Sequence, residues 1–336
     1  ITEPAVGLGG GLVLAFFHDT NKGPDGKVKK GPTGKPVPPS VSLVGGLGTE
    51  NGTWGAFGGH LGVWKDDRIR YTGGAGYVSV NLDYYGLVSQ ILGKPLAFNI
   101  EGFALVQDLQ FRIKDTPLFL GARYVYFQNT VKFDKLLPIP GVEPPDLDSA
   151  IGGLGGVATW DSRDNFFTPN TGVKAQATLT FWDPAFGSDH TYRTVDLYGL
   201  GWCQVAPTVN VGLRLDLQAA DGDVPFWAQP FVNLRGIPAM RYQGNEVFVA
   251  ETEVRWDFTR RWSLVGFTGY GRAVRDLDDL PGFFEDRGEA QNAWNVGGGV
   301  RYLIARAMGL RVGFDIARGP EEWAFYVTVG SGWLRI

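Results

Sequence analysis

The side chains best suited to chemistry are few and scattered along the 336 residues of this chain. The three histidines, His18, His60 and His190, lie far apart in the sequence, and their spacing matches no metal-ligand pattern. No Gly-x-Ser-x-Gly motif marks a nucleophilic serine. The single cysteine, Cys203, excludes a disulfide framework or a thiolate metal cage within one chain. We therefore predict no catalytic centre, no metal and no cofactor.

Two glycine runs and one acidic run are weaker candidates for binding sites. Residues 7–11 and the pair Gly73-Gly74 mimic phosphate-binding loops, but no helical pattern follows either one. We expect in-strand glycines instead to relieve crowding or to weaken strand pairing. The five carboxylates between Asp276 and Asp286 could hold a cation, and a solvated loop is the simpler interpretation.

The charge and composition exclude several classes of protein. Thirty-one basic residues against 35 acidic ones give a net charge of -4, so no basic footprint for nucleic acid is present. Only 20% of the residues are charged and 13% are aromatic, which excludes a disordered polyampholyte. No uncharged apolar run approaches the roughly 20 residues that a membrane helix needs. The chain is therefore neither a nucleic-acid-binding protein nor a helical membrane protein.

Hydrophobicity alternates with a period of two along most of the chain. Between Val209 and Ala220 the odd positions are apolar, while the even ones include Arg214 and Asp216. Between Val247 and Phe258 the apolar residues occupy most even positions, and the odd ones include Glu251 and Glu253. This alternation is typical of strands with one apolar and one polar face. A soluble β-sandwich or propeller and a membrane barrel both produce it.

Three further features favour the membrane barrel. The strands run to about 10 to 13 residues, whereas soluble strands usually have about 5 to 6 and tilted membrane strands about 9 to 11. Tight connections such as 259–261 and 305–307 alternate with long ones at 21–39, 134–149, 221–245 and 276–290. Aromatic residues gather near the strand ends, as in the interfacial girdles of outer-membrane barrels: Trp54, Trp64, Tyr71, Tyr84, Tyr85, Trp160, Phe166, Phe167, Trp182, Trp256, Phe258, Trp262, Trp323 and Trp333.

The alternating segments predict a single all-β domain over residues 1–336, a transmembrane antiparallel β-barrel. Fifteen strands are predicted: Gly7–His18, Ser40–Thr49, Thr53–Trp64, Ile69–Val80, Phe98–Ile113, Leu118–Phe133, Ile151–Asp161, Val173–Trp182, Tyr192–Gln204, Val209–Ala220, Glu246–Phe258, Trp262–Arg275, Gln291–Leu303, Gly309–Arg318 and Trp323–Trp333. A closed bacterial barrel has an even number of strands. We therefore expect a sixteenth strand between Asn81 and Ala97.

Several motifs in the second half resemble those of the bacterial surface antigen superfamily, which includes BamA, TamA and the two-partner secretion transporters. Residues 161–172 resemble its D-x-R-D-N-x-x-x-P-x-x-G periplasmic turn through Asp161, Arg163, Asp164, Pro169 and Gly172. Residues 234–238 resemble the V/L-R-G-F/Y motif of the loop that folds back into the lumen, and residues 253–255, 267–271, 297–302 and 315–319 follow the patterns of the final strands. Gly269 departs from the pattern by replacing a carboxylate that accepts from the loop arginine. The last residue is Ile336 instead of an aromatic one, so the C-terminal insertion signal is either imperfect or displaced to Trp333.

The resemblance implies that Arg235 lies on a loop inside the barrel. A lone buried charge there costs several kcal/mol, so the arginine needs carboxylate partners. The hypothesis is that Arg235 pairs with Glu253, and with Glu251, while Gly236 lets the backbone turn. Arg255 and Asp315 complete this loop-anchoring lumen site, with Asp216 nearby. The alternative is an arginine on a solvated hairpin tip.

The resemblance also implies a function and a location. We expect a non-enzymatic barrel in the outer membrane of a Gram-negative bacterium that inserts, translocates or binds polypeptide or lipid at the seam between its first and last strands. Outer-membrane lipids, polypeptide substrates and a second copy joined through the seam are the expected partners. The glycines at 7–11 and at 330–332 predict a short, strained seam.

The sequence is compatible with three interpretations of the chain. The chain can be a naturally short member, which its first four residues favour because they look like the family's lead into the first strand. It can also be the translocator barrel of a larger two-part protein that carries periplasmic or patatin-like domains. A passive diffusion porin is the third possibility.

Overall fold

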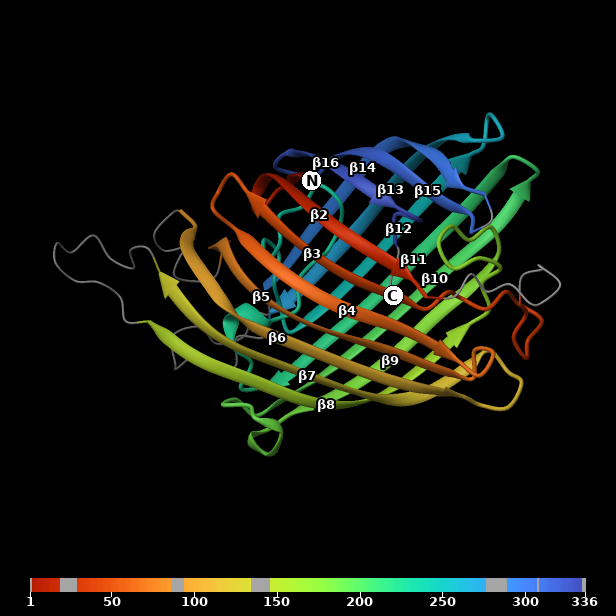
Figure 1. Ribbon diagram of the computed structural model, residues 1–336. Coiled ribbons are helices and arrows are strands. Elements are labelled where there is room, and N and C mark those ends of the chain that lie inside the picture. Colours follow the sequence, from red (N-terminus) through yellow and green to blue (C-terminus); the bar gives the residue numbers. More distant parts are fainter. Residues whose placement is uncertain are drawn as a thin grey trace.

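The computed structural model describes residues 2–18, 29–85, 94–133, 146–275, 289–306 and 308–333. These residues form one 16-stranded antiparallel sheet whose strands follow one another in sequence order. Figure 1 shows the strands inclined around a cylinder, with the first residues beside β16. Two single turns of 3-10 helix, Pro184–Phe186 and Phe226–Ala228, interrupt the loops. No helix among the described residues is long and apolar enough to cross a membrane.

The strands differ widely in length, and those from β5 to β8 are among the longest. Their bounds are β1 Thr2–Glu3, β2 Gly7–Phe17, β3 Val41–Thr49, β4 Trp54–Trp64, β5 Ile69–Tyr84, β6 Leu96–Arg112, β7 Leu118–Phe133, β8 Leu147–Asp161, β9 Gly172–Trp182, β10 Tyr192–Ala206, β11 Val209–Gly222, β12 Glu246–Trp256, β13 Trp262–Arg275, β14 Glu289–Ala305, β15 Leu310–Arg318 and β16 Trp323–Val329.

The prediction of an antiparallel barrel with sixteen strands is confirmed, but the sixteenth strand is not where we expected it. It is β1, at the start of the chain. The expectation of a strand between Asn81 and Ala97 is wrong. Tyr84 pairs with Leu96, and an unbroken ladder runs from there to the pair Ile69 and Phe111, so β5 and β6 are direct neighbours. Residues 86–93 lie outside the described part of the chain, as does the acidic run from Asp276 to Asp286.

The last predicted strand also ends earlier than expected, at Val329. Gly330 has a φ of 85°, a left-handed conformation that turns the chain away from the sheet. The next amide, Ser331 N, donates to Phe167 O at 2.7 Å. Trp333 is only 5% exposed and packs inside the barrel, so grouping it with the interfacial aromatic residues near the strand ends is wrong.

The two faces of the sheet have opposite chemistry. Leu213 and Trp256 are 48% and 50% exposed on the outer wall, whereas Glu251 and Arg301 on the inner wall are each 1% exposed. Tryptophans near the strand ends also point outward: Trp54, Trp64, Trp160, Trp256, Trp262 and Trp323. The wall is therefore apolar outside and polar inside, the arrangement of a membrane barrel.

The two ends of the cylinder also differ. The turn end carries the tight connections 65–68, 113–117, 207–208, 257–261 and 306–309, and the loop end carries 85–95, 134–146, 223–245 and 276–288. Residues 18–40 join β2 to β3 at the turn end, so grouping this segment with the other long loops is wrong. Short hairpins at 50–53 and 319–322 likewise lie at the loop end, so the alternation holds only in part.

Candidate functional site

The loop of residues 223–245, here called the inward loop, joins β11 to β12 and lies inside the wall at the loop end. Its residues Val232, Leu234 and Ile237 are 1 to 3% exposed and pack against inward side chains of β12, β13 and β14. Its residues Phe226, Trp227 and Met240 pack against an apolar cluster on β6 and β7 that contains Phe98, Ile100 and Val131. Because the inward loop contacts both groups of strands, it crosses the barrel from one wall to the other.

Arg235 of the inward loop meets three carboxylates on the wall. Its Nε donates to Glu251 Oε1 at 3.1 Å, and its Nη1 donates to Glu253 Oε2 at 2.9 Å and to Asp315 Oδ2 at 3.1 Å. Glu251 and Asp315 are 1% and 0% exposed. These bonds compensate the cost of burying the guanidinium and join the loop to β12 and β15.

Uncharged groups fix the arginine further. Its guanidinium carbon lies 3.4 Å from the centre of the Phe267 ring. Asn295 Nδ2 donates to Arg235 O and to Glu251 Oε1, each at 3.0 Å. Gly236 has a φ of 85°, and a Cβ there would lie 2.9 Å from Gly319 N, so this position requires glycine.

Two more arginines and one further acid extend the cluster. Arg301 Nη2 donates to Asp315 Oδ2 at 2.9 Å, and Arg214 Nη2 donates to Asp216 Oδ2 at 2.5 Å. With Arg235, Glu251 and Glu253, this makes three cations against four carboxylates, a formal net charge of 3 − 4 = −1. An uncharged donor from the end of the chain also bonds one of these carboxylates: Trp333 Nε1 donates to Glu251 Oε2.

Gly269, which departs from the family pattern, stands opposite Asn295 in the ladder between β13 and β14. A Cβ at this position would lie 2.8 Å from Asn295 Oδ1 and 3.0 Å from Leu234 Cδ2. A carboxylate therefore has no room here. The space is taken by Leu234 of the inward loop and by Asn295, which bonds the main chain of the arginine instead of its side chain.

The predicted periplasmic turn forms a second polar centre at the turn end. Arg163 donates to both oxygens of Asp161 at 2.8 and 2.9 Å, and Arg70 Nη1 donates to Asp161 Oδ2 at 2.7 Å. Asp164 Oδ1 accepts from the main-chain amides of residues 170 and 171. Gly172 has a φ of 106°, a left-handed conformation that favours glycine. Pro169, between Asp164 and Gly172 in the sequence, is fully buried.

Arg255 belongs to this second centre and not to the loop arginine. Its Nε donates to Asp257 Oδ1 at 3.1 Å, and its Nη2 donates to Asn170 Oδ1 in the turn. Its placement in the loop-anchoring set is therefore wrong. Successive inward positions of a strand are two residues apart, so Glu253 reaches the inward loop while Arg255 reaches the turn end.

The inward loop is also tied to the hairpin between β15 and β16. Gly236 N donates to the hydroxyl of Tyr326 on β16 at 2.8 Å. The Tyr242 hydroxyl donates to Glu321 Oε1 at 2.5 Å, and Arg241 Nη2 lies 3.2 Å from the same oxygen. Burial, and after it the hydrogen bond to Glu321, raises the pKa of the Tyr242 phenol above its ordinary value of 10.0.

Sequence reasoning missed several members of the site. Asn295, Phe267, Arg214, Arg301 and Trp333 all contact Arg235 or its carboxylates. Arg214 and Arg301 could have been found, because each falls on the polar face of a predicted strand. The sequence pattern did not predict an inward position for Trp333, because that position depends on the left-handed turn at Gly330.

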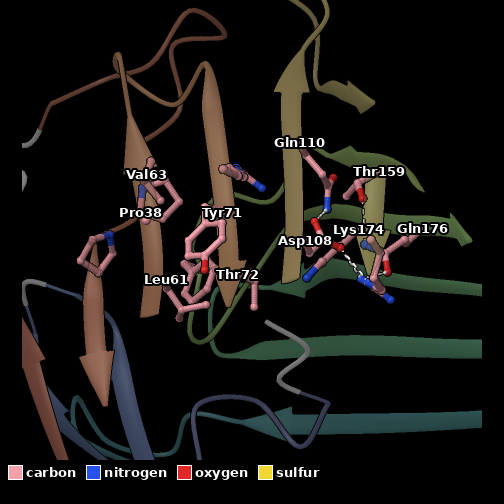
Figure 2. Close-up of a pocket in the computed structure, with 15 residues that line it drawn as sticks. Pro38, Leu61, Val63, Tyr71, Thr72, Asp108, Gln110, Thr159, Lys174 and Gln176 are labelled. Atoms are coloured by element: carbon pink, nitrogen blue, oxygen red, sulfur yellow. Dashed lines mark hydrogen bonds and ion pairs between the residues drawn. The ribbon is translucent and has the colours of Figure 1, made fainter. Parts of the chain in front are cut away.

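A small cavity lies in the lumen between β4 and β5 on one side and β6 to β9 on the other. Figure 2 shows Asp108, Gln110 and Gln176 on the polar side of this cavity and Leu61 and Val63 on the opposite side. Gln110 Nε2 donates to Asp108 Oδ1 at 2.8 Å. The cavity volume is about 60 Å³.

Comparison with known proteins gives no match to any family model or curated sequence. Solved structures do match. BamA from Haemophilus ducreyi, lacking POTRA domains 1-3, superposes with a TM-score of 0.60 at 12% identity, over 98% of this chain and 68% of that one. CdiB from Escherichia coli superposes with a TM-score of 0.61 at 11% identity, over 97% of this chain and 59% of that one. The fold is that of the BamA and CdiB barrels.

A second CdiB, from Acinetobacter baumannii, has a TM-score of 0.51 at 9% identity and covers 87% of this chain and 53% of its own. The chain thus spans between about half and two thirds of the length of these three structures. The resemblance inferred from the motifs is confirmed at the level of the fold.

Proposed function

We propose that residues 1–336 form a single-domain barrel in the outer membrane of a Gram-negative bacterium, and that this barrel inserts or translocates polypeptide at its seam. The observation that carries this proposal is the double attachment of the inward loop. Arg235 holds it to the wall, while Gly236 and Tyr242 hold it to the hairpin that ends the sheet. The similarity in fold to BamA and CdiB supports the same function.

The form of the seam supports the proposal. β1 has only two residues, pairs with β2 at Gly7 and Leu8, and lies against β16. The expected direct pairing of the glycine-rich β2 with the last strand is not found among the described residues, because β1 lies between them. Within the described residues, the part of β2 from Gly10 to Phe17 pairs with β3 on one side, and no strand pairs with it on the other side. An exposed edge of this kind accepts an added strand.

The same edge is apolar on both faces. Leu12, Val13 and Phe16 are 68%, 55% and 56% exposed. A substrate strand, a lipid acyl chain or a second copy of the barrel would bury this surface. A polypeptide strand satisfies the main-chain groups as well as the side chains, which is why we favour it over lipid and over a homodimer.

Two other functions stay open to test. A translocator barrel for further domains of a longer protein is compatible with the lengths of the compared structures. A passive porin is disfavoured by the inward loop, which crosses the lumen between its two apolar clusters.

Single-channel recording in planar bilayers separates these possibilities. We expect small, irregular openings from the parental chain and larger, longer ones from Arg235→Ala, because the loop then loses its three carboxylate partners. Arg193→Ala, which removes an ion pair whose side chains are 63% and 71% exposed, is the matched control and should record like the parent. Steady large conductance from the parental chain would establish a porin instead.

Cross-linking tests the seam itself. One cysteine in β1 and one in β16, in a background where the exposed Cys203 is replaced by serine, should lock the seam on oxidation. We expect polypeptide insertion into vesicles to stop on oxidation and to return on reduction. Undiminished insertion by the locked barrel would contradict a moving seam.

A further inference from the structure

Two of the three histidines converge on one serine on the outer wall near the turn end. Ser42 Oγ lies 2.6 Å from His18 Nε2 and 2.9 Å from His60 Nδ1. Ser42 and His60 are directly paired across β3 and β4, and His18 directly follows β2. Trp54 and Trp64, at even positions of β4 like His60, are 48% and 44% exposed, so this face of the strand is the outer one.

The geometry is that of an activated hydroxyl. A serine hydroxyl has one proton to donate, so one imidazole accepts it while the other donates to the same oxygen. A nucleophile within hydrogen-bond reach of a base, with that base held by further groups, is the arrangement of covalent catalysis. The centre of the His60 ring lies 6.4 Å from the ring centre of Trp64 and 6.3 Å from that of Tyr71, so both rings pack beside the imidazole. The Tyr71 hydroxyl donates in turn to Gln107 Oε1 at 2.5 Å.

Two glycines make this packing possible. A Cβ at Gly62 would lie 2.5 Å from the Trp64 ring, and one at Gly73 would lie 1.9 Å from the Tyr71 hydroxyl. Both rings can therefore lie along the wall beside His60. His18 remains exposed on the other side of the serine, so the hydroxyl can be approached from outside the barrel.

The position of the serine points to its substrate. Trp64 belongs to a set of exposed tryptophans at the turn end that includes Trp160, Trp256 and Trp262. Such rings sit at the level of the lipid headgroups, where the outer wall changes from apolar to polar. Ser42 is one position into β3 at the same end, so it faces the depth at which the acyl esters of membrane lipids lie.

We propose that Ser42 is a nucleophile that cleaves an acyl ester of a membrane lipid, with His60 as its general base. Ser42 Oγ forms a bond to the ester carbonyl carbon as His60 Nδ1 takes the hydroxyl proton. The ester C–O bond then breaks, and the leaving alcohol receives that proton. Water attacks the acyl-serine with the same base, releasing a fatty acid and the free hydroxyl. In this scheme the His18 ring is the donor to Ser42 Oγ, and His60 is the ring that accepts the hydroxyl proton.

The activity is independent of strand insertion at the seam, and its test uses the whole barrel in vesicles of ester-linked phosphatidylethanolamine and phosphatidylglycerol. We expect fatty acid release, and labelling of the barrel by a fluorophosphonate probe. Ser42→Ala should abolish both. His60→Gln should lower release at least a hundredfold, within the range lost with a general base. Vesicles of ether-linked lipids should yield no fatty acid.

Two controls keep the test specific. Thr130→Ala removes an outer-wall hydroxyl bonded to Asp148, and His190→Ala removes the third histidine, which is bonded to Asp223. Both variants should release fatty acid at the parental rate. The proposal is overturned if Ser42→Ala is labelled like the parent, or if the parent releases no more fatty acid than Ser42→Ala.

Discussion

Tyr242 of the inward loop donates a 2.5 Å hydrogen bond to Glu321, in the hairpin between β15 and β16. The two residues lie 79 positions apart in the sequence. The bond joins the loop that crosses the lumen to the last two strands, and β16 lies against β1 at the seam. The bond therefore connects the inward loop to the strands beside the edge at which we propose that polypeptide enters.

Arg235→Ala should destabilise the barrel by about 3–5 kcal/mol, because it leaves buried carboxylates without their cation. The measurement is the midpoint of heat-modifiable gel mobility in detergent. Arg193→Ala breaks only an exposed pair and should change stability by less than about 1 kcal/mol. Equal midpoints for the two variants would show that the buried pairs do not anchor the loop.

Gly269→Ala should destabilise the barrel by about 1–3 kcal/mol, since the new methyl group overpacks against Asn295 and Leu234. Part of this loss should return when Leu234→Ala is added, so the two changes should be non-additive. The four midpoints of a double-mutant cycle measure the coupling. Strict additivity would mean that the glycine does not make room for the loop.

Alkaline pH should weaken the attachment at Tyr242. Its pKa is raised in the folded state, so its contribution is fully present below the unfolded pKa of about 10 and is lost as pH rises above that value. Thermal midpoints of the parent and of Tyr242→Phe should differ at pH 8, by the roughly 1.5–3 kcal/mol of a hydrogen bond to a charged group. The difference should shrink progressively above pH 10. A constant difference up to pH 12 would contradict this assignment.

Trp333→Phe should destabilise the barrel by about 1–3 kcal/mol, because it deprives the buried Glu251 of an N–H donor. Trp323→Phe is the matched control, because Trp323 is 58% exposed on the outer wall. Protease access to the C-terminal segment reports the same contact. If cleavage after residue 329 is equally slow in both variants, the indole bond does not hold the segment inside the barrel.

The strands and their two faces were decided by the sequence alone. Alternation fixes which side chains share a face, because successive residues of a strand point to opposite sides. Phe248, Val254 and Trp256 therefore had to face one way and Glu251 the other, and the long apolar faces together with the motifs indicated which way was outward. Fifteen strands followed from this pattern, and Arg235 could be matched with acids on the next strand.

Closure of the cylinder decided the rest, because it brings together residues that no local pattern relates. Asp315 reaches Arg235 across 80 positions, and Ser42 is bonded to histidines 24 and 18 positions away. The β1 strand is too short to show alternation. The left-handed conformation of Gly330 turns the chain inward, so Trp333 lies inside the barrel and not on its outer wall. Arg255 was assigned to the wrong partners because alternation gives the face of a residue but not its depth in the barrel. Depth depends on strand tilt and register, and these are set only when every neighbour is paired.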